Sequence, residues 1–146
     1  MASAAARNLP AETEEICEQI LAVAQKVNAE LRKVLGRKLT EKNDYHPAFS
    51  TALIKAGLKA QNFYPIETPY GSRSRKPDLL INGCVLVEAK KENWSNQGLK
   101  WQNFAQGYHY VRASALPVCL VVNFGGMDIQ VMWVTPDAEI TLAERS

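Results

Sequence analysis

The sequence contains no apolar run close to the ~20 residues that a membrane-spanning helix requires. A transmembrane segment is therefore not expected, and no membrane partner is predicted. A strong net charge is also missing, because 17 basic residues are nearly balanced by 15 acidic ones, which leaves a formal charge of +2. Binding of a polyanion would therefore have to come from a local basic patch and not from the whole surface.

Cysteine is scarce and badly placed for a metal site or a disulfide framework. Cys17, Cys84 and Cys119 are isolated in the sequence and lack the short spacing of metal ligands. Cys84 and Cys119 lie in apolar, strand-like runs, which predicts buried and reduced thiols. This favours an intracellular, reducing compartment, with the cytoplasm as the first expectation and an organelle or the nucleus left open. Gly125-Gly126 lacks the context of a phosphate-binding loop and is interpreted as a turn.

What the sequence does contain is the composition of one soluble globular domain. Hydrophobic residues make up 47% and charged residues 22% of the 146 residues, enough for one substantial core but not for two. We expect a flexible N-terminus at 1–10, a single domain at 11–134 and a C-terminal tail at 135–146. No internal repeat or low-complexity segment is visible in the chain.

Hydrophobic periodicity predicts the order of helices and strands. Apolar residues at helical spacing predict a long amphipathic helix at 11–35, between Pro10 and Gly36. Two further helices are expected at 46–56 and 97–113, and strands at 63–70, 78–81, 84–89, 118–124 and 127–134. The two prolines in 63–70 predict an edge strand, whereas the apolar run at 118–124 predicts a strand buried on both faces. This order indicates an α/β (α+β) fold with a mixed β-sheet flanked by helices.

Three charged residues in two neighbouring strands form the most informative pattern of the chain. Asp78 follows a proline, and Glu88 and Lys90 end the next strand on one face, because side chains alternate along a strand with period two. Two carboxylates can hold a hard divalent cation such as Mg²⁺. The competing interpretation is a set of ordinary charges at strand ends. The apolar surroundings favour the site, because a charge is costly there unless it is paired or bound to a metal.

The turn at Asn82-Gly83 decides whether this site can form. A two-residue hairpin would pair Ile81 with Cys84 and put Asp78 and Glu88 on opposite faces of the sheet. A three-residue loop with Gly83 in the left-handed conformation would pair Leu80 with Cys84 and leave both carboxylates on one face. We predict the odd-length loop.

The helix expected at 97–113 supplies a second set of polar residues. Gln106 and Tyr110 are four residues apart and therefore share a face, next to Asn103. The core-facing stripe of this helix is predicted to contain Trp101, Phe104, Ala105, Tyr108 and Val111. His46 and His109 are interpreted as structural residues and not as ligands.

The residues Pro77-Asp78 and Glu88-Ala89-Lys90 resemble the signature of the PD-(D/E)xK nuclease superfamily. The segment from Gln106 to Tyr110 resembles the QxxxY element of a subset of these nucleases. More narrowly, the blocks at 45–57, 105–110 and 121–125 are similar to the GxxExxY group of small putative nucleases. The resemblance covers about 39–134 and implies a restriction-endonuclease-like fold with an extra long N-terminal helix.

The sequence departs from the GxxExxY pattern at its start. The glutamate three residues before Tyr45 is Lys42 here, and the preceding glycine is Leu39. The superfamily often uses an acid of the early helix to assist its metal, so Glu41 or Asp44 would have to substitute, or a second metal would be absent. A degenerate nuclease domain that serves as a nucleic-acid-binding or assembly subunit is therefore the alternative. It would bind a protein partner or a second copy through the 11–35 helix.

The resemblance implies metal-dependent hydrolysis of phosphodiester bonds, with DNA as the first expected substrate and RNA as the second. Asp78, Glu88 and the backbone carbonyl of Ala89 would hold Mg²⁺ or Mn²⁺, and Lys90 would orient the attacking water or stabilise the developing charge. Gln106 would position substrate or a metal-bound water, and Tyr110 would support it. Phosphates of the substrate would meet a basic rim, whose alternative interpretation is a solvated loop. The rim would consist of Arg73, Arg75, Lys76 and Lys91.

Overall fold

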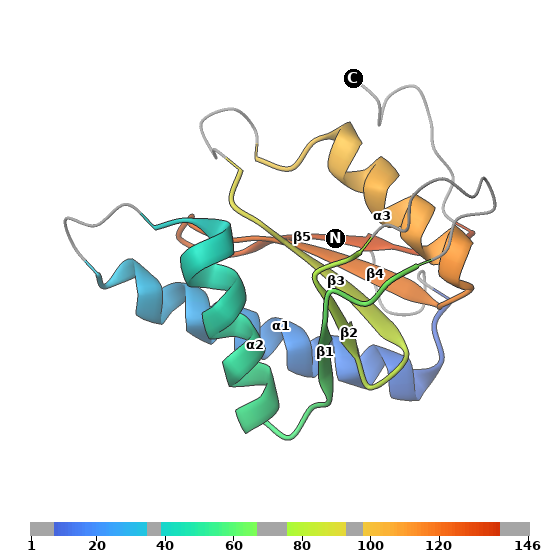
Figure 1. Cartoon of the computed structure of the whole chain (residues 1–146), viewed down its shortest axis with the longest axis horizontal. Helices are drawn as coiled ribbons and strands as arrows, with labels where there is room; N and C mark the ends of the chain where they lie inside the picture. Colours follow the sequence, from blue (N-terminus) through green and yellow to red (C-terminus); the bar gives the residue numbers. More distant parts are fainter. Residues whose placement is uncertain (1–7, 35–38, 67–75, 93–97, 138–146) are drawn as a thin grey trace.

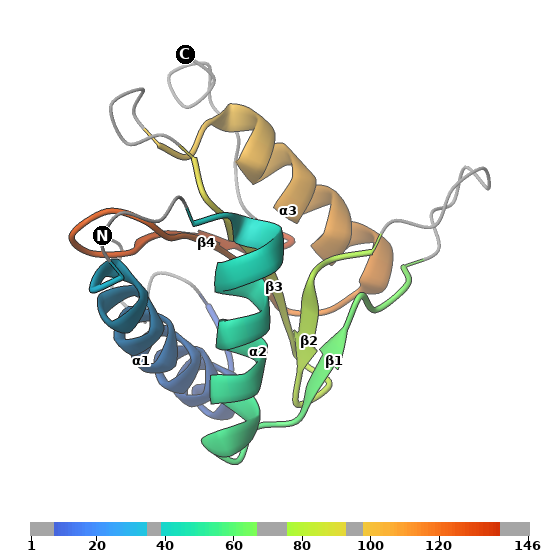
Figure 2. The same cartoon turned by 60° about the vertical axis from the view of Figure 1, so that its left-hand side comes forward.

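A computed structural model of the chain describes residues 8–34, 39–66, 76–92 and 98–137. A five-stranded sheet has helices α1 and α2 on one face and helix α3 on the other (Figures 1 and 2). The helices are α1 (Ala11–Arg32), α2 (His46–Lys55), preceded by the π-helical turn η2 (Glu41–Tyr45), and α3 (Trp101–Ser114). The strands are β1 (Ala60–Asn62), β2 (Leu79–Ile81), β3 (Val85–Lys90), β4 (Val118–Asn123) and β5 (Gln130–Val134). Among the described residues, no helix combines the length and apolarity needed to cross a membrane.

The strand order β1-β2-β3-β4-β5 follows the sequence, and α3 lies in the connection between β3 and β4. The pairs β1–β2, β2–β3 and β4–β5 are antiparallel, and only β3–β4 is parallel among the described pairs. The mixed sheet flanked by helices is therefore confirmed. All six residues of β4 are buried, as predicted for a strand covered on both faces.

Each face of the sheet carries its own hydrophobic core, because alternate residues of a strand point to opposite sides. On the face covered by α1 and α2, the strand residues Ile81, Val87 and Leu120 pack with Ile20 and Phe49. The other face is covered by α3. Its core includes Leu80, Leu86, Cys119, Val121, Tyr110 and Val111.

Helix α1 is tied to the turn between β4 and β5 by polar side chains in an otherwise apolar interface. The Asn28 side chain is fully buried; its Nδ2 donates to the Gly126 carbonyl, and its Oδ1 accepts from the Gly125 N–H. Gln25 Oε1 accepts from the Ile129 N–H in the same way. The helix predicted at 11–35 is thus present but ends at Arg32, and residue 35 lies outside the described part.

The strand predicted at 63–70 is wrong where the structure describes it. The observed strand β1 lies just before it and ends at Asn62, because Phe63 has a left-handed backbone with φ of 52°. A left-handed residue cannot continue an extended strand. Residues 67–70 lie outside the described residues. Among the described strands, β1 borders β2 alone and so lies at the edge of the sheet.

The β2–β3 hairpin has the predicted parity but a different register. Leu80 pairs with Leu86 and not with Cys84, and Ile81 pairs with Val85. Asn82 and Gly83 have φ values of 51° and 69°, the combination of a type I′ turn, and the Cys84 N–H donates to the Ile81 carbonyl at 3.1 Å. Cys84 is therefore the extra residue that converts a two-residue turn into an odd-length loop.

Helix α3 is rotated relative to the predicted orientation. Its buried residues are Asn103, Gly107, Tyr110 and Val111. Of the predicted stripe only Val111 is buried, whereas Trp101, Phe104, Ala105 and Tyr108 are partly buried. The contact is set by Gly107, where a Cβ atom would lie 3.2 Å from Val134 Cγ2 and 3.4 Å from Val121 Cγ2. The small residue lets the helix backbone approach the sheet closely, which turns the larger aromatic rings toward the flank of the helix.

Candidate active site

Asp78 and Glu88 meet one residue beyond Leu79 and Val87, the last pair of the β2–β3 hairpin. The Asp78 N–H donates to Glu88 Oε1 at 2.7 Å, and the Ala89 N–H donates to Asp78 Oδ2 at 2.7 Å. Each carboxylate thus accepts a backbone hydrogen bond from the other strand. The odd-length loop places both carboxyl groups together, as the hairpin argument required.

Lys90 completes this group from the next position on the same face of β3. Its Nζ lies 3.4 Å from Glu88 Oε2, and 23% of its side chain is exposed, against 5% for Glu88. Lys90 is therefore the solvent-facing member of the group, and Glu88 is the buried one. The Lys90 ammonium can therefore contact both the Glu88 carboxylate and a ligand that approaches from solvent.

The pKa of Glu88 is raised from 4.5 to about 7, chiefly by burial and next by the neighbouring charge of Asp78. The Lys90 ammonium and the backbone hydrogen bond from Asp78 lower the pKa but do not offset the first two effects. The pair therefore carries more negative charge than its surroundings stabilise. A divalent cation at this place would supply positive charge, and carboxylate oxygens are the ligands that such cations prefer.

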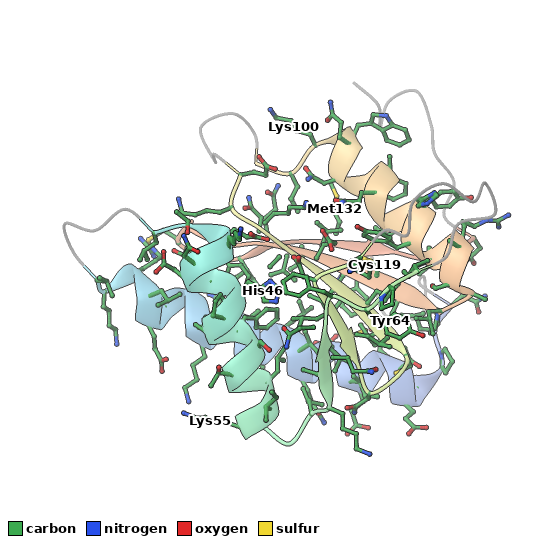
Figure 3. The ribbon with its side chains drawn as sticks, viewed as in Figure 1. His46, Lys55, Tyr64, Lys100, Cys119 and Met132 are labelled. Carbon is green, nitrogen blue, oxygen red and sulfur yellow. The ribbon has the colours of Figure 1, made fainter. Side chains whose placement is uncertain are left out.

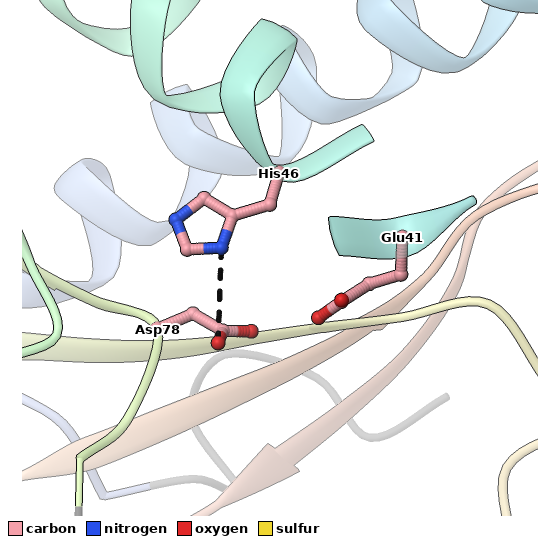
Figure 4. A group of neighbouring side chains, drawn as sticks. All are labelled: Glu41, His46 and Asp78. Atoms are coloured by element: carbon pink, nitrogen blue, oxygen red, sulfur yellow. Dashed lines mark ion pairs between the residues drawn. The ribbon is translucent and has the colours of Figure 1, made fainter. Parts of the chain in front are cut away.

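A second group of ligand atoms approaches Asp78 from the helical side (Figure 4). Glu41, His46 and Asp78 each offer one atom, and these atoms all lie within 4.8 Å of one another. His46 Nδ1 is 3.8 Å from Asp78 Oδ1. Burial, the charge of Asp78 and a hydrogen bond with Asp78 all raise the pKa of Glu41. Asp78 is thus shared between a group on the sheet and a group on the helix.

The π-helical turn explains why Glu41 reaches the site. The Tyr45 N–H donates to the Thr40 carbonyl and the His46 N–H to the Glu41 carbonyl, both of which are i+5 bonds. A turn of this type places residues five apart on one side, whereas an α-helix would align residues three or four apart. Glu41 and His46 therefore face Asp78 together (Figure 4), and Lys42 is exposed.

His46 is held in place by its second ring nitrogen. His46 Nε2 lies 3.0 Å from Asn62 Oδ1, and the side chain is almost fully buried at the start of α2 (Figure 3). An amide oxygen accepts a hydrogen bond, so Nε2 donates to Asn62, and Nδ1 is the ring nitrogen that faces Asp78 and Glu41. A ring fixed in this way by a second partner is the usual arrangement of a metal-binding histidine.

Gln106 and Tyr110 approach from α3, as their spacing predicted. Gln106 Nε2 donates to Tyr110 Oη at 3.1 Å, and the Tyr110 ring is 3% exposed within the core under α3. Burial raises the pKa of Tyr110 well above its usual value, and the charge of Glu88 raises it further. Gln106 is the more accessible of the two residues.

The remaining predicted residues are not gathered around the carboxylates. Asp44 caps its own turn, because its Oδ2 accepts from the Thr40 N–H at 2.7 Å. Lys76 is exposed one residue before the buried Pro77. Lys91 is exposed just after the end of β3, and its aliphatic chain lies close to Gly125. Arg73 and Arg75 lie outside the described residues.

Residues 14–134 match the family model of the PD-(D/E)XK nuclease superfamily. The chain belongs to this superfamily. No curated protein sequence matches it significantly. Among solved structures, an alkaline exonuclease (LHK-Exo) from Laribacter hongkongensis aligns over 80% of this chain and 68% of its own, with 16% identity and a TM-score of 0.51. The complex of LHK-Exo with dAMP covers the same shares at 16% identity and a TM-score of 0.49.

The likeness to LHK-Exo shows the fold alone, and it agrees with the five-stranded sheet between helices that is typical of PD-(D/E)XK nucleases. Sequence reasoning missed His46 and Asn62 as members of the site of this nuclease fold. A spacing of five residues between Glu41 and His46 matches no common helical or strand period, so the pattern carried no signal for either residue.

Proposed function

We propose that the chain is a metal-dependent nuclease that hydrolyses phosphodiester bonds, with DNA as the expected substrate and RNA as the second. The observation that carries this proposal is the convergence of Asp78, Glu88 and Lys90 at one end of the sheet. Glu41 and His46 support it, because they add two donor atoms on the other side of Asp78. We assign the activity to the domain at 11–134, between the proposed flexible ends.

The residues that would hold Mg²⁺ or Mn²⁺ are Asp78, Glu88, Glu41, His46 and the carbonyl of Ala89. The raised pKa of Glu88 and Glu41 supports this assignment, since both acids lack a sufficient positive partner among the described residues. When bound, the cation would lower the pKa of a water molecule and neutralise charge that develops on the phosphate.

The protein groups would prepare and stabilise the reaction around this charge. The Lys90 ammonium, held beside Glu88 Oε2, would orient the attacking water and donate to the phosphate oxygen on which negative charge develops. The amide of Gln106 would position the substrate phosphate or a water, and Tyr110 would hold that amide through its hydroxyl. Arg73, Arg75, Lys76 and Lys91 would contact phosphates farther along the strand.

The departure at Lys42 no longer argues against activity if Glu41 serves as the early-helix acid. We infer that the chain is nearest to the GxxExxY group and carries its acid one residue earlier, which the π-helical turn would accommodate. The alternative function is a degenerate nuclease domain in an assembly. The observation that favours this alternative is a groove of about 720 Å³ between α1 and α2, where a protein partner or a second copy would bind. Its apolar lining includes Val23, Val27, Leu31, Ala48 and Ala52.

The test is cleavage of labelled single-stranded and duplex DNA and RNA with Mg²⁺ or Mn²⁺. Asp78→Asn removes the carboxylate shared by both groups and should lower kcat at least ~1,000-fold, because it removes a metal ligand. Lys90→Ala should lower kcat about 100- to 1,000-fold, the usual cost of a lost donor to developing charge. Lys59→Ala is the matched control, since Lys59 is an exposed lysine just before β1, at the end of the sheet away from Asp78.

Cleavage by the wild type that disappears in both variants and persists in Lys59→Ala supports the nuclease. A wild type that cuts no substrate with either metal contradicts it, as does equal cutting by the wild type and the two site variants. Binding of nucleic acid without cleavage would instead support the degenerate subunit.

A further inference from the structure

An exposed aromatic ring lies beside the proposed metal group. Phe63 is 54% exposed, although a side chain of its size and apolarity is usually buried. Its ring packs on the imidazole of His46 at a centroid distance of 5.0 Å, with the planes tilted by 48°. His46 Nδ1 in turn lies 3.8 Å from Asp78 Oδ1. Only one imidazole ring therefore separates the exposed phenyl ring from the carboxylate that the two groups share.

The backbone of Phe63 holds the ring in this place at a cost. Its φ of 52° is a left-handed value that is unusual for a bulky side chain. The Phe63 N–H donates to the Asp78 carbonyl at 2.9 Å, and the preceding Asn62 is bonded to His46 Nε2. Residues that keep such a conformation are held by their surroundings and occur often at ligand sites. The same contacts that position His46 and Asp78 therefore fix Phe63.

We propose that Phe63 is a substrate-binding residue that stacks on an unpaired base of the nucleic-acid strand whose phosphate lies at Asp78. This inference rests on the proposed nuclease function and goes beyond it, because it names the state of the substrate. In a nucleotide, one sugar separates the base from the phosphate. In the protein, the imidazole ring of His46 separates Phe63 from the Asp78 carboxylate, so the two spacings are similar. Aromatic rings bind bases of any sequence through their π-faces.

The geometry favours an unpaired base over a base inside a duplex. His46 lies against one side of the phenyl ring, with the planes tilted, so a base can approach from the exposed side but not from the side of His46. A paired base would have to leave its stack to reach the ring, which costs free energy that a single-stranded or frayed end does not require. The proposed substrate is therefore a single strand or an unpaired end.

The experiment measures fluorescence anisotropy of a labelled oligothymidylate, with Ca²⁺ in place of Mg²⁺ and the integrity of the probe checked on a gel. The matched probes are the same strand with abasic residues and a hairpin duplex of equal charge. Phe63→Gly should weaken binding of the oligothymidylate about 10-fold, within the usual range for one stacked base. Glycine also accommodates the positive φ of this position, so the variant keeps the fold. Phe63→Trp should restore tight binding, with its indole fluorescence quenched by the stacked base.

Ile54→Ala provides the control, because Ile54 is also 54% exposed but lies near the far end of α2 from His46. It should bind every probe as the wild type does. The wild type should bind the abasic and duplex probes about as weakly as Phe63→Gly binds the intact strand. Equal binding of the oligothymidylate by wild type and Phe63→Gly overturns the inference, as does an equal loss on the abasic probe. If the wild type cleaves DNA with Mn²⁺ but either of these two binding results is obtained, the proposed nuclease function is retained and the proposed role of Phe63 is refuted.

Discussion

The two groups that share Asp78 are built in different ways. Glu88 and Lys90 stand on β3, a strand with neighbours on both sides, and their positions follow from the pairing of the sheet. Glu41 and His46 stand on a π-helical turn and the first residue of α2, outside the sheet. The first group is fixed by a ladder of backbone bonds, whereas the second depends on one irregular turn and the bond from Asn62.

This difference separates what each group can contribute. The sheet group combines a buried acid with a lysine, and burial destabilises the ionised form of that acid, Glu88. The helix group adds an imidazole and a more accessible acid, and in the proposed site these ligands would influence which cation binds and how tightly. We expect changes in the sheet group to affect charge and chemistry, and changes in the helix group to affect metal binding.

The largest expected effect concerns the charge on the sheet group. The folded protein raises the pKa of Glu88 from 4.5 to about 7, so it holds this proton more tightly than the unfolded chain does. The resulting stability is fully present below pH ~4.5 and is lost as pH rises through ~7. Without metal, the free energy of unfolding should fall by about 3 kcal/mol across this window. Urea unfolding at each pH measures it.

Glu88→Gln is the control, because the amide resembles the protonated acid and cannot ionise. The pH dependence in this window should be much flatter in the variant. Mn²⁺ should restore the stability of the wild type above pH 7, since the metal binds the ionised form. If the free energy of unfolding depends on pH equally in the wild type and the variant, Glu88 is not the group whose raised pKa causes the effect.

The next effect tests the helix group against the family pattern. Glu41→Gln keeps a side chain that can bond to Asp78 but removes a charge from the proposed metal ligands. We expect the KM for metal to rise about 10- to 100-fold, a typical loss for weakened metal ligation. Lys42→Ala changes the position at which the GxxExxY pattern has its glutamate. It should change the KM for metal little, because Lys42 is exposed. Metal titrations of the cleavage rate compare the two variants, and the reverse order of effects would refute the assignment of Glu41.

The comparison also shows how much of the site could be read from the sequence. Glu88 and Lys90 were predictable because a strand has a fixed period of two and the apolar residues around them set its faces. The turn at Asn82-Gly83 was predictable, but this dipeptide is compatible with both loop lengths. The predicted odd-length loop is correct, whereas the predicted register is wrong, because the extra residue is Cys84 and not Gly83. The mixed sheet, the buried strand at 118–124 and the pairing of Gln106 with Tyr110 followed from the same periodic patterns.

The helix group could not be predicted in this way. A π-helical turn has no period that recurs in the sequence, and its formation depends on the contacts of Tyr45 and His46 with the folded sheet. The orientation of α3 was wrong for a related reason. Apolar periodicity favoured the larger aromatic residues, whereas close packing at Gly107 decides which face meets the sheet. Both errors arise where tertiary contacts override a local pattern.

A smaller effect is expected on the choice of metal. Imidazole is a poor ligand for Mg²⁺, which prefers oxygen, and is tolerated better by Mn²⁺. His46→Ala should therefore lower the activity with Mn²⁺ about 10-fold and the activity with Mg²⁺ by less, which reduces the Mn²⁺/Mg²⁺ ratio. The ratio is informative because partial unfolding of the variant would lower both activities equally. An unchanged ratio would assign His46 a structural role only.

The smallest effect concerns the support of the sheet group by α3. Tyr110→Phe keeps the buried ring but removes the hydroxyl that accepts from Gln106 Nε2 at 3.1 Å. Loss of this bond should lower the free energy of unfolding by about 1 kcal/mol, since a neutral hydrogen bond contributes that much on balance. Cleavage should fall about 3-fold if the amide of Gln106 loses its orientation toward the phosphate. Tyr108→Phe on the flank of the same helix is the control. If Tyr110→Phe changes stability but not cleavage, Gln106 supports the helix without acting on the substrate.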